Sequence, residues 1–330
     1  MRPRPLSQAG LRALMLAPAC WWVAHRTARR MAQAGWRAPV PVVSVDSLAG
    51  GVGLPAALSA ALAVIGRLQG RGLLPVVVMR ADVPAPVRVV ARGHSCADVG
   101  DAALLAAAFA PTWVAGDLVA GVRAACEHAR ANGSSPDCIV LYGAAYDPGI
   151  HKDLSIAVVG AARGFGNGLC RPAGPLPEPL AQALARVDIC LSIGPPALQA
   201  QFTTAWGRAI PAPLMQGQMA ALPTGMDWRG LRALAFSGAG EPGHFLAALR
   251  GLGGEVVRAV TLSAAGPLSP ALAARLRREA AALRAQLVTT EADALRLPDD
   301  LRREVLVLPM RLQVADWGAL DAALDHLAVR

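Results

Sequence analysis

Arg163 and Asn167 stand in a glycine-rich stretch, residues 160–179, that follows an apolar run at residues 154–159. The run has the composition of a buried strand. Dense glycine after a strand lets the backbone turn sharply and approach a ligand. An arginine and an asparagine at such a turn could hold an oxyanion or a sugar hydroxyl. The alternative is a tight turn carrying a solvated arginine, and the residues alone leave both interpretations open.

A second glycine-rich loop contains Gly50, Gly51 and Gly53, between a predicted strand at residues 40–45 and a predicted helix at residues 56–68. Strand, glycine-rich loop and helix in this order are the setting of a phosphate-binding P-loop. Its backbone N–H groups cradle phosphates. Phosphoryl transfer also needs a lysine on the phosphates and a Ser or Thr on Mg²⁺. The loop is therefore either a phosphate site without its chemical side chains or a structural loop.

Arg80 and Asp101 are further candidates for a ligand-binding cleft. Arg80 ends a predicted strand at residues 75–79, and Asp101 precedes a predicted helix at residues 102–110. The arginine could bind an anion and the aspartate could serve as an acid in the site, although helix capping is the commoner role of an aspartate there. No metal-ligand set is predicted, because the six cysteines lack any C-x-x-C pair. Their scatter favours reduced thiols in a cytosolic compartment.

The segment Arg-Gly-Phe-Gly-Asn-Gly followed by Pro-Ala-Gly-Pro-Leu-x-Glu-Pro resembles the tetraacyldisaccharide 4'-kinase family, the lipid A 4'-kinases. The matching residues are Gly164, Phe165, Gly166, Asn167, Gly168, Pro172, Ala173, Gly174, Pro175, Leu176, Glu178 and Pro179. Looser matches extend the resemblance from Val40 to Leu312. Membership implies a peripheral kinase on the cytoplasmic face of the inner membrane. It would use ATP and Mg²⁺ to phosphorylate the 4' position of a lipid A disaccharide 1-phosphate precursor.

The chain departs from the family pattern where the family has its chemical groups. The family's Gly-Gly-Thr-Gly-Lys-Thr matches residues 50–55, where Leu54 and Pro55 replace Lys and Thr. Its strand-end Asp-Asp-Gly-x-Gln matches residues 142–146, which begin Tyr-Gly. Its Asp-His-His segment falls between His244 and His326, where this chain has no histidine. The resemblance thus implies a kinase whose activity in this copy is weak or lost.

Charge and composition point to a membrane surface. Seven of the nine net positive charges lie in the first 45 residues, which contain no acid. A predicted helix at residues 7–30 places Trp21 and Trp22 before Arg26, Arg29 and Arg30. Paired tryptophan beside basic residues favours a helix in the interface of an anionic membrane. An ordinary amphipathic helix and a signal peptide ending at Cys20 are the alternatives, and no nucleic-acid-binding signature is present.

The sequence predicts an α/β fold made of a P-loop-NTPase-like parallel-sheet domain and a smaller second α/β domain, with a cleft between them. The predicted ranges are a membrane-associating helix over 1–36, the first domain over 37–222 and the second over 223–330. No catalytic residue is assigned. Three functions stay open. The first is a lipid A 4'-kinase homologue that still serves, or descends from, that pathway, and the second is a pseudokinase that binds lipid or a partner enzyme at the inner membrane. The third is an enzyme with a different phosphoryl or sugar chemistry that uses Arg80, Asp101 and Arg163.

Overall fold

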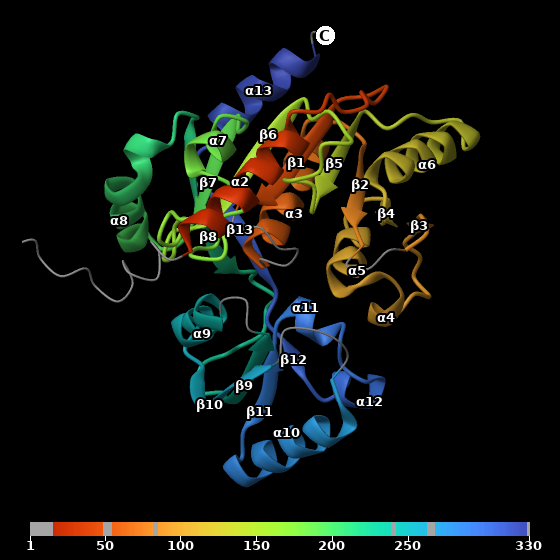
Figure 1. The fold of residues 1–330 in the computed structure, drawn as a ribbon. Helices are drawn as coiled ribbons and strands as arrows, with labels where there is room; N and C mark the ends of the chain where they lie inside the picture. The colour runs from red at the N-terminus through yellow and green to blue at the C-terminus, as the bar shows by residue number, and fades with distance from the viewer. Residues whose placement is uncertain (1–15, 49–54, 82–84, 239–241, 263–267, 329–330) are drawn as a thin grey trace, which may run out of the picture.

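The computed structural model describes residues 16–48, 55–81, 85–238, 242–262 and 268–328. Within these ranges the chain forms a nine-stranded sheet and a four-stranded sheet, drawn in the upper and lower halves of Figure 1. The strand order is β13-β8-β7-β6-β1-β5-β2-β4-β3 in the large sheet and β10-β9-β11-β12 in the small one. The predicted α/β class is confirmed, and most of the strand pairs are parallel.

The centre of the large sheet is built from short apolar runs. They form β1 (Val42–Ser47), β2 (Pro75–Arg80), β5 (Cys138–Tyr142) and β6 (Leu154–Gly160). β1 pairs in parallel with both β5 and β6, and β2 pairs in parallel with β5. The carboxyl ends of these strands therefore meet at one edge, where α/β proteins bind ligands. Outer strands are β3 (Arg88–Val89), β4 (Thr112–Ala115), β7 (Ile189–Ile193), β8 (Leu214–Ala221) and β13 (Met310–Val314).

Helices cover both faces of the large sheet because side chains alternate along each buried strand. Val43 and Val45 pack with α3 (Pro55–Gly70), α5 (Asp101–Ala107) and α13 (Gly318–Ala328). On the other face, Val42 packs with α6. The helices of that face are α6 (Leu118–Ala131), α7 (Leu180–Leu184) and α8 (Pro196–Trp206), while α4 (Cys96–Val99) and the 3-10 turn η1 (Gly207–Ala209) join other elements.

The small sheet is parallel throughout and has its own core. Its strands are β9 (Arg232–Gly238), β10 (Glu255–Leu262), β11 (Gln286–Thr289) and β12 (Leu306–Val307). Its helices are α9 (Pro242–Gly251), α10 (Pro270–Leu283), α11 (Glu291–Ala294) and α12 (Asp299–Arg302). Leu234 and Phe236 pack with the α10 side of the sheet, whereas Ala233 and Ala235 pack with the α9 side.

The end of the chain returns to the large domain. β13 pairs antiparallel with β8, with Leu312 opposite Met219. Leu320 and Leu324 of α13 are buried against α3, and Asp321 of α13 accepts hydrogen bonds from Arg67 and Arg71. The predicted unit 223–330 therefore divides in the structure, because the apolar face of α13 completes the core of the first domain.

The N-terminal helix is α2 (Ala17–Met31), and none of its residues is buried. It agrees with the described part of the predicted helix 7–30, and residues 1–15 lie outside the described ranges. Trp21 is 66% exposed and Trp22 is 57% exposed. Figure 1 shows α2 lying in front of the central strands of the large sheet. Among the described residues, we find no helix with both the length and the apolar character needed to cross a bilayer.

Candidate active site

Asp46 is a buried carboxylate at the carboxyl end of the central strand β1, with 7% of its surface exposed. Its Oδ1 accepts the backbone N–H of Gly143 at 2.6 Å. Its Oδ2 accepts the N–H of Ala144 at 3.0 Å and the hydroxyl of Ser44 at 2.7 Å. Burial raises the pKa of Asp46 to about 6, although these hydrogen bonds oppose the rise. The side chain thus ties β1 to the loop after β5.

Lys152, the only lysine of the chain, points into the same loop. Its Nζ donates to the carbonyl oxygens of Ala144 at 2.5 Å, Ala145 at 3.3 Å and Asp147 at 3.2 Å. Burial lowers the pKa of Lys152 to about 8, and the charge of Asp46 opposes that change. An ammonium group has three N–H donors, and each of the three has a carbonyl acceptor in this loop.

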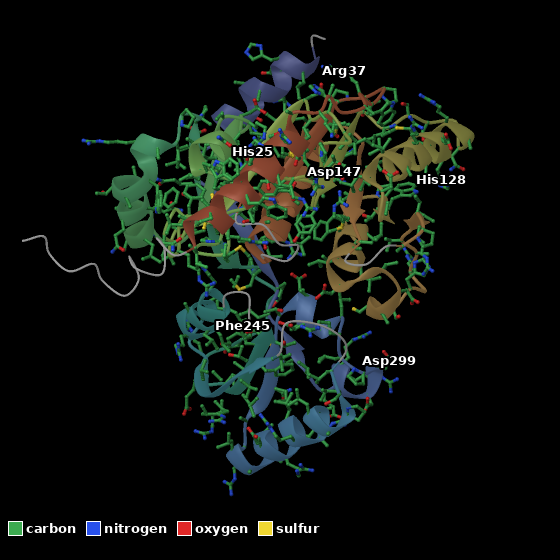
Figure 2. All side chains as sticks on the ribbon, viewed as in Figure 1. His25, Arg37, His128, Asp147, Phe245 and Asp299 are labelled. Carbon is green, nitrogen blue, oxygen red and sulfur yellow. The ribbon has the colours of Figure 1, made fainter. Side chains whose placement is uncertain are left out.

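Arg80 and Asp147 form an ion pair beside this lysine. Arg80 ends β2, and its guanidinium also donates to the carbonyl oxygens of Gly143 at 3.1 Å and Gly116 at 3.2 Å. Burial lowers the pKa of Arg80. Asp147 accepts the N–H of Gly149 at 2.7 Å, as expected of a turn residue. Asp147 is labelled in Figure 2, within the large domain.

A cavity of about 270 Å³ lies against this network. Its wall includes Asp46, Lys152 and His151, together with apolar surface from Ala157. The other wall residues are Met31, Gln33, Gly35, Ser44, Leu48, Ala145, Asp147, Pro148, Ile150, Ser155, Ile156, Ala183, Arg186 and Val187. Met31 is the last residue of α2, so the N-terminal helix ends beside the cavity. The arrangement can hold a small group that has one polar and one apolar side.

The candidate residues predicted from the sequence lie at three separate places. Arg80 is in the network above. Asp101 begins α5, where its carboxylate accepts the N–H of Ala102 at 2.8 Å and its helix packs against α11 of the small domain. Arg163 is exposed in the turn after β6, where its N–H donates to the carbonyl of Gly160 at 3.2 Å. The P-loop remnant Gly50, Gly51 and Gly53 lies outside the described residues.

Asn167 holds the glycine-rich loop together. Its amide nitrogen donates to the carbonyl of Ala173 at 2.9 Å, and its Oδ1 accepts the N–H of Leu169 at 3.1 Å. Gly164 has a φ of +53°, and a Cβ placed there would lie 2.3 Å from the indole nitrogen of Trp206. Phe165 is buried against the same Trp206 with an edge-to-face ring contact. These residues have structural roles, and the prediction that Asn167 faces a ligand stays a prediction.

Glu178 of the same motif is fully buried and pairs with Arg186. Within the described part of the chain, its Oε2 has no hydrogen-bond partner. Tyr146 lies near this pair and donates its hydroxyl to the carbonyl of Leu48 at 2.7 Å. A buried carboxylate oxygen without a partner is costly, so this position beside the cavity wall is suited to a ligand donor or a water molecule.

The carboxyl end of β5 carries Tyr142 and Gly143, as the sequence alignment predicted. Among the described residues, we find no group of three His, Cys, Asp or Glu that could hold a metal ion. Asp46 and Asp147 are the nearby carboxylates. Three of the roughly four lone-pair positions of Asp46 already accept hydrogen bonds, and Asp147 is paired with Arg80. These residues do not fit a Mg²⁺ ion held by carboxylates at this strand end.

Sequence reasoning overlooked Asp46 and gave no site role to Glu178, Asp147 or Lys152. One signal was available, because Asp46 is a charged residue inside the otherwise uncharged run of β1. Lys152 was visible as the only lysine of the chain. What the spacing does not reveal is that the loop after β5 folds back so that Lys152 reaches its carbonyl groups.

Comparisons with known proteins agree with this architecture. The model of the tetraacyldisaccharide-1-P 4'-kinase family (LpxK) matches residues 12–328. A tetraacyldisaccharide 4'-kinase of Dinoroseobacter shibae is 46% identical over 98% of this chain and 95% of its own length. One of Jannaschia sp. is 43% identical over 98% of this chain and 97% of its own. The crystal structure of the "apo" form of LpxK from Aquifex aeolicus in complex with ATP superposes with a TM-score of 0.69.

That solved structure shares 18% sequence identity with this chain, covering 95% of this chain and 98% of its own, and it confirms the fold. The family match and the two relatives extend over nearly the whole chain. The resemblance drawn from the glycine-rich motif is therefore confirmed: this chain belongs to the tetraacyldisaccharide 4'-kinase family.

Proposed function

We propose that this protein binds a lipid A disaccharide precursor at the cytoplasmic face of the inner membrane, and that its own ATP-dependent transfer to the 4' position is weak or absent. Family membership supports the substrate class. The replaced chemical groups support the loss of activity. A pseudokinase that holds lipid or a partner enzyme is the form of this proposal that we favour.

The observation that carries the proposal is that the two half-buried cations of the site, Lys152 and Arg80, are already used to hold the backbone. Lys152 donates to three backbone carbonyls, and Arg80 pairs with Asp147 while bonding two more. A phosphoryl group in transfer spreads negative charge over its oxygens, which a free cation must neutralise. To act as that free cation, Lys152 or Arg80 would have to break its hydrogen bonds and leave backbone carbonyl groups without a donor.

Asp46 adds a second obstacle. Its carboxylate occupies the backbone N–H groups of Gly143 and Ala144 at the end of β5. Those N–H groups are therefore unavailable to a phosphate oxygen, and an ionised carboxylate nearby repels one. Mg²⁺ could offset that repulsion, but Tyr142 and Gly143 supply no carboxylate to help hold it at this strand end.

Membrane association is supported by α2. Trp21 and Trp22 are mostly exposed, and the Arg26 guanidinium lies 5.4 Å from the centroid of the Trp22 ring. Arg29 and Arg30 extend the positive surface in the last turn. Aromatic rings with adjacent arginines favour the boundary between lipid headgroups and water.

Calorimetric titration of the purified full chain with ATP, with and without Mg²⁺, tests the proposal. A family member that retains Gly-Gly-Thr-Gly-Lys-Thr is the positive control. We expect the control to bind Mg·ATP at a concentration where this chain gives no saturable signal. Saturable Mg²⁺-dependent binding of comparable affinity by this chain would contradict the proposed loss of the nucleotide site.

A further inference from the structure

Two half-exposed cysteines that are 150 residues apart lie against each other in the structure. Cys20 belongs to α2 and Cys170 to the glycine-rich loop. The Cys20 sulfur donates to the carbonyl oxygen of Cys170 at 3.2 Å. From standard bond lengths, a carbonyl oxygen is about 2.4 Å from its own Cα, so the Cys20 sulfur lies within about 5.6 Å of the Cα of Cys170. A disulfide places each sulfur about 4 Å from the Cα of the partner cysteine, so the two residues need to approach by at most about 2 Å.

The electrostatics agree with this proximity. Burial raises the pKa of Cys170, and a negative charge on Cys20 raises it further. The neighbouring charge of Glu178 acts in the same direction.

The packing of α2 and of the glycine-rich loop would let a disulfide between Cys20 and Cys170 form and break without disturbing the core. No residue of α2 is buried, so the helix can shift slightly without opening a core. The loop around Cys170 is firmer, because Gly164 packs on Trp206 and Asn167 bonds across to Ala173. Cys20 thus stands on a helix without buried residues, beside Cys170 on a loop held by its own packing and hydrogen bonds.

We propose that Cys20 and Cys170 are a redox-sensitive pair whose disulfide fastens α2 to the glycine-rich loop. A low-molecular-weight disulfide is the oxidant. The Cys20 thiolate attacks one sulfur of that disulfide, forming a mixed disulfide and releasing one small thiol. The Cys170 thiolate then attacks the Cys20 sulfur and releases the second small thiol. Two protein thiols are oxidised and one small disulfide is reduced, so the electrons balance.

A bond of this kind would be regulatory rather than a permanent cross-link, because cytosolic disulfides are usually transient. The remaining cysteines provide internal controls. Cys126, Cys138 and Cys190 are buried. Cys96 is half-exposed like the pair, and its sulfur donates to the carbonyl of Leu295 at 3.0 Å.

The test treats the full chain with glutathione disulfide, blocks remaining thiols by alkylation, and maps linked peptides by mass spectrometry without reduction. We expect a linked peptide joining Cys20 to Cys170 that disappears on reduction. It should persist in the Cys96→Ser variant and be absent from Cys170→Ser, where Cys20 instead carries glutathione. As a second readout, trypsin cutting after Arg30 should free the N-terminal fragment from the reduced protein but not from the oxidised wild type.

Separate glutathione adducts on Cys20 and Cys170 in the wild-type protein, without a linked peptide, would overturn the proposal. So would a link from Cys20 to any other cysteine. Both results come from the unmodified chain, so they do not depend on whether a variant folds.

Discussion

Replacing Asp46 with Asn should change how the stability of the protein depends on pH. The folded-state pKa of Asp46 is raised from 3.8 to about 6. A raised carboxylate pKa contributes stability that is fully present below the unfolded-state value and is lost as the pH rises through the folded-state value. One pKa unit corresponds to about 1.4 kcal/mol, so the wild type should lose about 2–3 kcal/mol of unfolding free energy from this group between about pH 4 and pH 7.

Asp46→Asn removes this titration. The amide keeps one acceptor oxygen but turns an NH₂ group toward a backbone donor, which leaves the N–H of Gly143 or Ala144 unpaired at a cost of about 1–3 kcal/mol. That cost is the same at both pH values, whereas the carboxylate contribution is not. Lys152, whose pKa is about 8, changes its contribution only at higher pH.

Urea unfolding followed by circular dichroism, at about pH 4 and pH 7, measures the difference between the wild type and Asp46→Asn. We expect the variant to gain about 2–3 kcal/mol relative to the wild type on going to the higher pH. Asp227→Asn, which removes an exposed carboxylate that accepts one backbone bond, is the matched control. A difference between wild type and Asp46→Asn that stays constant across this range would refute the assignment of a destabilised buried carboxylate.

Three further changes test other parts of the structure. Gly174→Ala should destabilise the protein by about 2 kcal/mol or more in the same urea assay, because the new Cβ would lie 2.2 Å from the carbonyl oxygen of Leu169. The control is Gly66→Ala, in α3 with open space around it. This variant should be neutral or stabilising by up to about 1 kcal/mol. The double variant Leu54→Lys and Pro55→Thr, which introduces the family's Lys and Thr, should not show kinase activity, because Tyr142 and Gly143 still offer no carboxylate. Activity of this variant within tenfold of an intact family member would contradict the prediction. Deleting residues 1–36 should abolish sedimentation with anionic vesicles, and raised salt should weaken vesicle binding of the full chain; equal sedimentation of the truncated chain would refute the role of α2.

The sequence was informative wherever structure follows from local pattern. The apolar runs predicted as strands at residues 75–79 and 154–159 form β2 and β6. Asp117 caps α6, accepting the N–H groups of Val119 and Ala120, as an aspartate before a helix commonly does. A specific motif also identified the family. Two of its glycines, Gly164 and Gly174, stand where any larger side chain would collide with a neighbour, so the loop requires glycine there.

What the sequence missed depends on contacts between distant residues. Asp46 bonds to N–H groups 97 and 98 residues away, and no periodicity encodes that distance. β8 and β13 pair with each other although the whole small domain lies between them in the sequence. The return of the chain to the large sheet therefore could not be inferred from the apolar pattern of α13. The structural use of Lys152 follows from how the loop after β5 folds, which depends on packing between β1, β5 and β6.

The most direct test of the account is transfer of phosphate from ATP to a lipid A disaccharide 1-phosphate in detergent micelles, with Mg²⁺, using the purified full chain. Circular dichroism should first show that the protein is folded, and an intact family member should be active under the same conditions. Because Lys152 and Arg80 are engaged by backbone carbonyl groups and Asp147, and Tyr142 and Gly143 bring no carboxylate to the end of β5, we predict product at the level of a reaction without enzyme. Phosphorylated product formed well above that level, and dependent on both ATP and Mg²⁺, would contradict the account.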